Sequence, residues 1–176
     1  MAVLQIIRNL FVPTELVETE IVVPAAPTSY EIHSLTEKQL KEVMQLNLRC
    51  FKKGENYTTH TFSYLLNEST TLSYRIVTPN EQIVAFIFVM TNQGTGHITT
   101  IGVAPEHRRR GLAKKLLAHV DEALRKREIT STSLEVRVSN IIAQSLYRDL
   151  GYTIVQRLNN YYNNGEDAFL MIKSLY

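Results

Sequence analysis

The chain has 176 residues and a net charge of +2, with 44% hydrophobic and 20% charged residues. This balance predicts one soluble globular domain with a sizeable core, and it argues against disorder and bulk nucleic-acid binding. No apolar run approaches the ~18 residues of a membrane span, and the N-terminus does not have the pattern of a secretion signal. The single cysteine, Cys50, excludes an internal disulfide, and the histidines lack metal-ligand spacing. We therefore expect a cytoplasmic protein without a metal.

The first 29 residues differ from the rest of the chain, because prolines at positions 13, 24 and 27 interrupt a short apolar run. We expect residues 1–29 to be an N-terminal extension and residues 30–176 to form the folded domain. The extension is interpreted as an arm that packs on this domain or on a partner subunit. The alternative is a partly disordered tail or an artefact of expression.

The first half of the domain predicts one strand, two helices and two more strands. After a strand over residues 30–35, Thr36 and Gln39 form a capping-box pattern. The apolar face of the helix that follows is Leu40, Val43, Met44, Leu48 and Phe51. A second helix begins at Thr58 or Thr59. Strands are expected over 72–78 and 83–91, and the second, being almost continuously apolar, should be central.

The second half begins with a strand over residues 97–103, and an amphipathic helix follows Gly111. A strand over 133–138 precedes a helix over 141–150, which Gly151 ends in the usual C′ position. Residues 152–157 and 168–174 then predict a closing hairpin. This order predicts a mixed α/β sheet with helices on both faces.

One stretch, from His97 to His119, combines a buried strand, a glycine-bearing turn and the start of a helix. Such a turn presents unpaired backbone N–H groups to an anion. Arg108, Arg109 and Arg110 add charge suited to phosphate. The stretch therefore predicts a site for a phosphorylated ligand, the alternative being a solvated basic turn.

The run Arg108-Arg109-x-Gly111-x-Ala113 resembles the acetyl-CoA signature of GNAT acyltransferases. Together with segments 134–140, 146–152, 160–162 and 165–168, it resembles the protein N-terminal acetyltransferases of the RimI and Ard types. The likeness covers residues 30–175. It implies the GNAT fold, an α/β fold whose mixed, mostly antiparallel sheet splays between its fourth and fifth strands, here 97–103 and 133–138.

The resemblance implies acetyl-CoA as the cosubstrate. Its expected contacts are the strand edge before the turn, the turn itself and an asparagine ahead of the last helix. These residues are Ile101, Gly102, Val103, Arg108, Arg109, Arg110, Gly111, Leu112, Ala113, Lys114 and Asn140. Asn140 is also explained as a plain helix N-cap.

The catalytic roles also come from the resemblance. Glu135 matches the general base and Tyr147 the general acid, while Glu55 either assists Glu135 or selects the substrate. Tyr57, Tyr161 and Tyr162 match substrate-binding residues. Each role has a purely structural alternative. Glu135 and Arg137 could form a surface pair, and Tyr161 and Tyr162 an exposed pair in the hairpin. Tyr147 could serve in packing, beside an apolar stripe of Ile142, Leu146 and Leu150.

The family implies an amine acceptor, and an α-amine is the easier one to deprotonate. Its pKa is ~7.7–8.0 against ~10.4 for lysine, a difference of about 3.5 kcal/mol. We expect acetyl transfer to the N-termini of proteins or peptides by direct attack, because Cys50 has no activating partner. Alternatives are a small-molecule amine, a lysine side chain, or an acyl-CoA-binding module without activity. We expect no nucleic-acid or membrane partner, and a monomer or weak homodimer.

Overall fold

The computed structural model describes residues 22–51 and 57–176, which build one seven-stranded sheet of order β1-β2-β3-β4-β5-β7-β6. The strands are β1 (Glu31–Ser34), β2 (Thr71–Val77), β3 (Ile83–Asn92), β4 (Thr95–Val103), β5 (Ser131–Arg137), β6 (Thr153–Leu158) and β7 (Ala168–Ser174). The helices are η1 (Glu37–Gln39), α2 (Leu40–Cys50), α3 (Thr59–Asn67), η2 (Pro105–His107), α4 (Leu112–Arg125) and α5 (Ile141–Asp149). The predicted order of elements is confirmed. Within the described ranges, no helix is long and apolar enough to cross a membrane.

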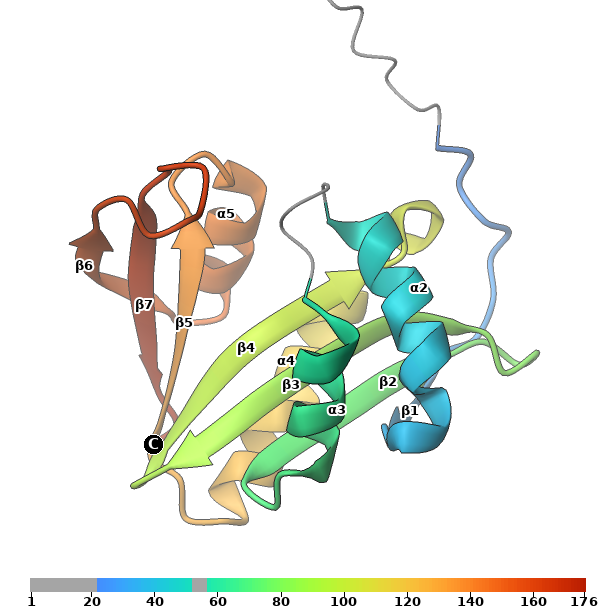
Figure 1. Cartoon of the computed structure of the whole chain (residues 1–176), viewed down its shortest axis with the longest axis horizontal. Coiled ribbons are helices and arrows are strands. Elements are labelled where there is room, and N and C mark those ends of the chain that lie inside the picture. The colour runs from blue at the N-terminus through green and yellow to red at the C-terminus, as the bar shows by residue number, and fades with distance from the viewer. Residues whose placement is uncertain (1–21, 52–56) are drawn as a thin grey trace, which may run out of the picture.

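The sheet splits between β4 and β5, the parallel neighbours; the other pairs are antiparallel. Their pairing runs from Thr95 and Ser131 only to His97 and Ser133. Beyond that point the two strands diverge, as Figure 1 shows. The predicted splay between the fourth and fifth strands is thereby confirmed, and residues 98–103 of β4 have no partner on β5.

Helices cover both faces of the sheet, with α2 and α3 in front and α4 behind in the view of Figure 1. Between them β3 is buried along residues 83–89, which confirms its predicted central place. One expectation for α2 was wrong: Leu48 is 61% exposed. Val43 is buried as predicted, and the other buried residues of the helix are Leu46 and Asn47. The apolar spacing fits two adjacent faces of this helix, and the face carrying Val43 and Leu46 is the one that packs.

A bulge in β4 changes the side of the sheet to which its residues point. Val89 pairs with Ile98 and Phe88 with Thr100, so Thr99 has no opposite residue. Before the bulge Gly96 lies against Leu124 of α4, and after it Gly102 lies against Phe86 and against Cys50 of α2. The side chains that follow Thr99 are therefore turned relative to those that precede it.

The packing around Gly102 leaves no room for a larger side chain. A Cβ at this position would lie 2.6 Å from the Phe86 ring, which is fully buried. We expect Gly102→Ala to lower the free energy of unfolding by about 1–3 kcal/mol, the usual result of overpacking a core. Thermal denaturation should show a correspondingly lower Tm. Adding Phe86→Leu to the Gly102→Ala variant should recover part of the lost stability. An unchanged Tm would show that the ring moves away freely.

Candidate active site

The turn into α4 carries a row of backbone N–H groups without acceptors. Arg109 and Gly111 have left-handed φ angles of 64° and 75°, a conformation that favours glycine at position 111. The first helical bond closes from Lys115 N–H to the Gly111 carbonyl. Among the described residues, the N–H groups of 109–114 have no hydrogen-bond acceptor. A helix N-terminus with such a turn is suited to phosphate oxygens.

Two of the three arginine side chains in this turn bond to the protein itself. Arg108 donates to the carbonyls of Val103 (3.2 Å) and Cys50 (3.3 Å). Arg110 donates to the carbonyls of Ala25 and Ala26 and to the Tyr30 hydroxyl. The guanidinium of Arg109 has no partner in the described part of the chain. The backbone of the turn, with Arg109, thus remains for an anion.

The edge of β4 leads through η2 into this turn. Ile101 and Val103 are partly exposed, while Gly102 is buried between them. Since β5 has diverged, this stretch of backbone is open to pairing with an extended ligand. The predicted contacts at 101–103 and 108–114 are therefore continuous in space.

Helix α5 presents a different face to the core than its sequence suggested. Ile142 is 78% exposed, whereas Tyr147 is only 7% exposed. The predicted apolar stripe through Ile142 is wrong, because Gln144 fills the buried face by donating to the carbonyls of Arg137 and Val138. Asn140 caps the helix, accepting from Ala143 N–H at 3.1 Å. Its N-cap interpretation is confirmed.

Tyr147 keeps its proton over the whole physiological range. Burial raises the pKa of its hydroxyl to about 12. Its ring lies edge-on to Tyr152, with ring centres 5.7 Å apart. The hydroxyl of Tyr147 has no hydrogen bond within residues 22–51 and 57–176. Such a neutral, uncommitted phenol has a proton to donate.

Glu135 lies beside His97, a contact that was not predicted. Strand alternation buries Leu134 and Val136 and turns Glu135 to the opposite face, as predicted. One carboxylate oxygen lies 3.4 Å from His97 Nε2, while His97 Nδ1 contacts the Ser133 hydroxyl at 3.3 Å. The parallel register of β4 and β5 makes this contact, and no sequence spacing reveals it.

Three tyrosines interact electrostatically with this carboxylate. Burial, followed by the negative charge of Glu135, raises the pKa of both Tyr57 and Tyr161. The same charge acts on Tyr162, whose ring meets that of Tyr161 edge-on with centres 5.1 Å apart. Tyr57 is fixed by donating to the Thr99 carbonyl at 3.1 Å. The three tyrosines predicted to bind the substrate therefore all lie within electrostatic reach of Glu135.

The hairpin that carries Tyr161 and Tyr162 is held by Arg137. Its guanidinium lies 3.7 Å from the centre of the Tyr162 ring. It also pairs with Glu166 at 2.7 Å, and Glu166 in turn accepts from Ser139 N–H. The pKa of Glu166 falls to about 2, chiefly because of its hydrogen bonds with Ser139, with further lowering by Arg137. Arg137 thus has a structural role beside the site.

Two further residues from the sequence analysis are Glu55, the proposed assistant of Glu135, and Cys50, which was expected not to act as a nucleophile. Glu55 lies outside the described residues. Cys50 is half-buried, and burial is the main reason that the pKa of its thiol is raised to about 11. A thiol in this environment is a poor nucleophile at neutral pH, in agreement with a packing role.

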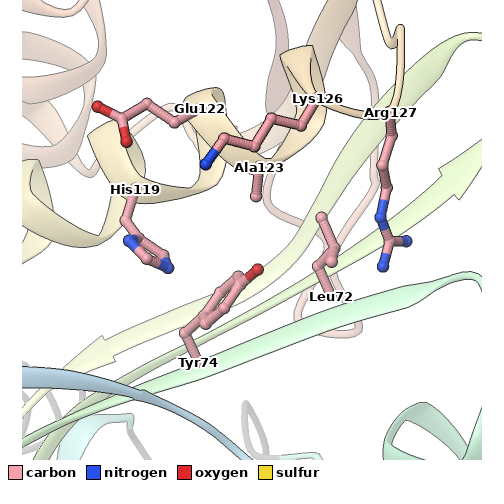
Figure 2. A pocket seen from close by; sticks show the side chains of 7 residues that line it. All are labelled: Leu72, Tyr74, His119, Glu122, Ala123, Lys126 and Arg127. Carbon is pink, nitrogen blue, oxygen red and sulfur yellow. The ribbon is translucent and has the colours of Figure 1, made fainter.

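A surface cavity of about 290 Å³ lies elsewhere, between β2 and the C-terminal half of α4. Figure 2 shows Tyr74 and His119 facing each other in it, with ring centres 4.5 Å apart. Charges of both signs, from Glu122 and Lys126, also line it. None of the residues predicted to bind coenzyme or substrate contributes to this cavity, so it is separate from the site around Glu135.

Comparison with known proteins gives the same picture. The model of the acetyltransferase (GNAT) family matches residues 40–152. The NAA10 catalytic subunit of the N-terminal acetyltransferase A complex of Arabidopsis thaliana is 35% identical over 150 residues, covering 82% of this chain and 77% of its own. The crystal structure of the ribosomal-protein-S18-alanine N-acetyltransferase from Escherichia coli is 28% identical, with a TM-score of 0.76 over 84% of this chain and 94% of that one.

A third similar structure was solved with ligands. It is the NatC complex bound to Gag peptide and CoA, 26% identical with a TM-score of 0.73 over 84% of this chain and 99% of that one. The family match covers well over half of the chain and excludes residues 22–39. The splayed sheet, the turn of unpaired N–H groups and these relatives agree: the chain is an acetyltransferase of the GNAT family.

Proposed function

We propose that this enzyme transfers the acetyl group of acetyl-CoA to the α-amine of protein N-termini. The observation that carries the proposal is that Tyr57, Tyr161 and Tyr162 all interact electrostatically with Glu135, just beyond the last paired residues of β4 and β5. The relatives are named as N-terminal acetyltransferases, which supports the same substrate class. Acetyl-CoA, when bound, supplies the acetyl group as a thioester.

The residues present fit this coenzyme. The unpaired N–H groups of 109–114 suit its phosphates, and the open edge at Ile101–Val103 suits its extended pantetheine arm. We propose that backbone rather than the side chains of Arg108 and Arg110 makes the phosphate contacts, because both guanidinium groups are already bonded to carbonyls. Asn140 borders the same end of the split, at the start of α5.

Glu135 is proposed as the group that makes the amine nucleophilic. At neutral pH an α-amine is mostly protonated, with a pKa of ~7.7–8.0, so only a modest base is required. Glu135 accepts this proton directly or through a water molecule, and His97, 3.4 Å away, orients the carboxylate. Tyr161 and Tyr162 hold the substrate backbone, and Glu55 remains a proposed assistant.

Tyr147 is proposed as the acid that completes the transfer. The amine nitrogen forms a bond to the acetyl carbon, and the carbon–sulfur bond breaks. The Tyr147 hydroxyl, with a pKa of about 12, gives its proton to the departing sulfur. Once bonded to the acetyl carbon, the nitrogen carries one proton more than an amide and loses it to solvent. The proton taken by Glu135 also returns to solvent, from which Tyr147 is reprotonated. The products are an N-acetylated chain and coenzyme A.

The experiment that tests this function is a thiol-release assay of purified protein with acetyl-CoA. The acceptor panel contains peptides with free N-termini of different first residues, N-blocked peptides with an internal lysine, and spermidine. We expect turnover only with free N-termini. Faster turnover of the lysine peptides or spermidine would contradict the α-amine assignment, and acetyl-CoA binding without any turnover would indicate a binding module.

A further inference from the structure

The segment ahead of the family match, residues 22–30, runs along the turn into α4; we call it the strap. It contains no helix or strand. Its Ala25 N–H donates to the carbonyl of Glu106, before the turn, at 3.0 Å. Its Tyr30 carbonyl accepts from Lys115 Nζ, after the turn, at 2.8 Å. The strap therefore spans the whole 109–114 turn and is fixed on both sides of it.

Arg110 is the point at which strap and turn are joined. One guanidinium nitrogen donates both to the Ala26 carbonyl (2.9 Å) and to the Tyr30 hydroxyl (2.8 Å). The other donates to the Ala25 carbonyl. Three of the five N–H donors of this arginine are committed to the strap, so both of its terminal nitrogens are already engaged. Its side chain is a tether rather than a ligand.

The Tyr30 hydroxyl extends the tether to η2. A guanidinium only donates, so this hydroxyl accepts from Arg110, and its own proton is available to His107 Nδ1, 2.9 Å away. The pKa of His107 is lowered, mainly by burial. Glu106 opposes this shift, whereas Arg110 and Arg49 add to it. The ring therefore stays neutral and can accept a hydrogen bond. The Tyr30 and His107 rings also meet edge-on.

The turn needs such support, because one of its residues has an unfavourable backbone angle. Arg109, with φ of 64°, is not a glycine and is held in the left-handed region. Conformations of this kind persist only where surrounding structure determines them. On each side of Gly111 the turn is bonded to the strap, through Arg110 and Lys115.

We propose that the strap is a positioning element for the coenzyme: by holding Arg110 through Tyr30, Ala25 and Ala26, it keeps the 109–114 turn in its N–H-presenting shape. This inference rests on the proposed role of that turn in binding acetyl-CoA. The strap touches neither Glu135 nor Tyr147, so it acts on coenzyme affinity and not on the chemical step.

Two variants in the full-length chain test the strap without touching the turn. Tyr30→Phe removes the hydroxyl between Arg110 and His107, and Ala25→Pro removes the N–H that bonds to Glu106. For Tyr30→Phe we expect the Kd of acetyl-CoA, measured by calorimetry, and its KM to rise about tenfold, the usual effect of one hydrogen bond to a charged group. For Ala25→Pro we expect both to rise about fivefold, because the lost bond joins two neutral backbone groups. kcat at saturating acetyl-CoA should remain that of the wild type.

A double-variant cycle and a matched control complete the test. In a protein carrying Arg110→Ala, Tyr30→Phe should have almost no further effect on Kd, because the tether is already cut. Tyr74→Phe is the control, since Tyr74 also lies edge-on to a histidine but far from the turn, and it should leave Kd unchanged. Circular dichroism and Tm verify that each variant is folded.

The outcomes separate this inference from the proposed function. If the wild type binds no acetyl-CoA, both are wrong. If the wild type binds it and both folded strap variants bind it equally well, only the positioning role is wrong. A lower kcat with unchanged KM, or fully additive effects of Tyr30→Phe and Arg110→Ala, would likewise overturn it.

Discussion

Glu135→Gln should lower kcat by about 10²–10⁴-fold at pH 7, the usual loss when a general base is removed. The glutamine keeps the size of the side chain on β5 and its neighbour His97, so acetyl-CoA affinity and Tm should change little. The deficit should shrink at pH 9, because an α-amine with a pKa of ~8 is then mostly neutral without help. Steady-state kinetics between pH 6.5 and 9.5 measure both effects.

The control for Glu135→Gln is Glu122→Gln on the exposed side of α4, which removes the same charge far from β5. It should leave kcat within about twofold of the wild type. A small deficit for Glu135→Gln, or one that is independent of pH, would contradict its role as base. The interpretation as a surface residue would then be favoured.

Tyr147→Phe should lower kcat by about 10²-fold without weakening acetyl-CoA binding, because the change removes only the proton offered to sulfur. The ring stays packed beside Tyr152, and the lost hydroxyl has no hydrogen bond in the described part of the chain, so stability should be preserved. Since the pKa of Tyr147 is raised to about 12, the wild-type rate should not fall up to about pH 10 through loss of this proton.

Tyr152→Phe provides the matched comparison, because its ring is the direct neighbour of Tyr147. Its hydroxyl accepts from the buried Thr132 at 2.9 Å. Removing it leaves the threonine hydroxyl unsatisfied and should lower the free energy of unfolding by about 1–3 kcal/mol while sparing kcat. Loss of acetyl-CoA affinity in Tyr147→Phe, in proportion to its loss of rate, would instead place Tyr147 in packing.

Local signals in the sequence predicted most of the fold. The capping box is formed by the Gln39 side chain, which accepts from Thr36 N–H, and Thr58 caps α3 as expected. Gly111 and Gly151 both adopt positive φ where the chain enters and leaves a helix. Such features depend on neighbouring residues alone, and for that reason one sequence is enough to read them.

The site was harder to predict from the sequence, because its contacts join strands that are distant in the chain. The His97–Glu135 contact depends on the parallel register of β4 and β5, and the direction of Gly102 depends on the bulge at Thr99. Neither has a local signature. Arg110 looked like a phosphate ligand by composition, yet its partners lie on residues 25–30. Charge alone does not distinguish a tether from a ligand.

The split between β4 and β5 also has a consequence for the life of the protein in a cell. It leaves residues 98–103 as an unpaired strand edge inside the sheet, and unpaired edges promote association between chains. A coenzyme that lies along this edge covers it, and a ligand at 100 times its Kd adds about 2.7 kcal/mol to the stability of the folded state. We therefore expect aggregation and proteolytic turnover to increase when acetyl-CoA is scarce, so that the supply of the acetyl donor sets the amount of enzyme as well as its rate.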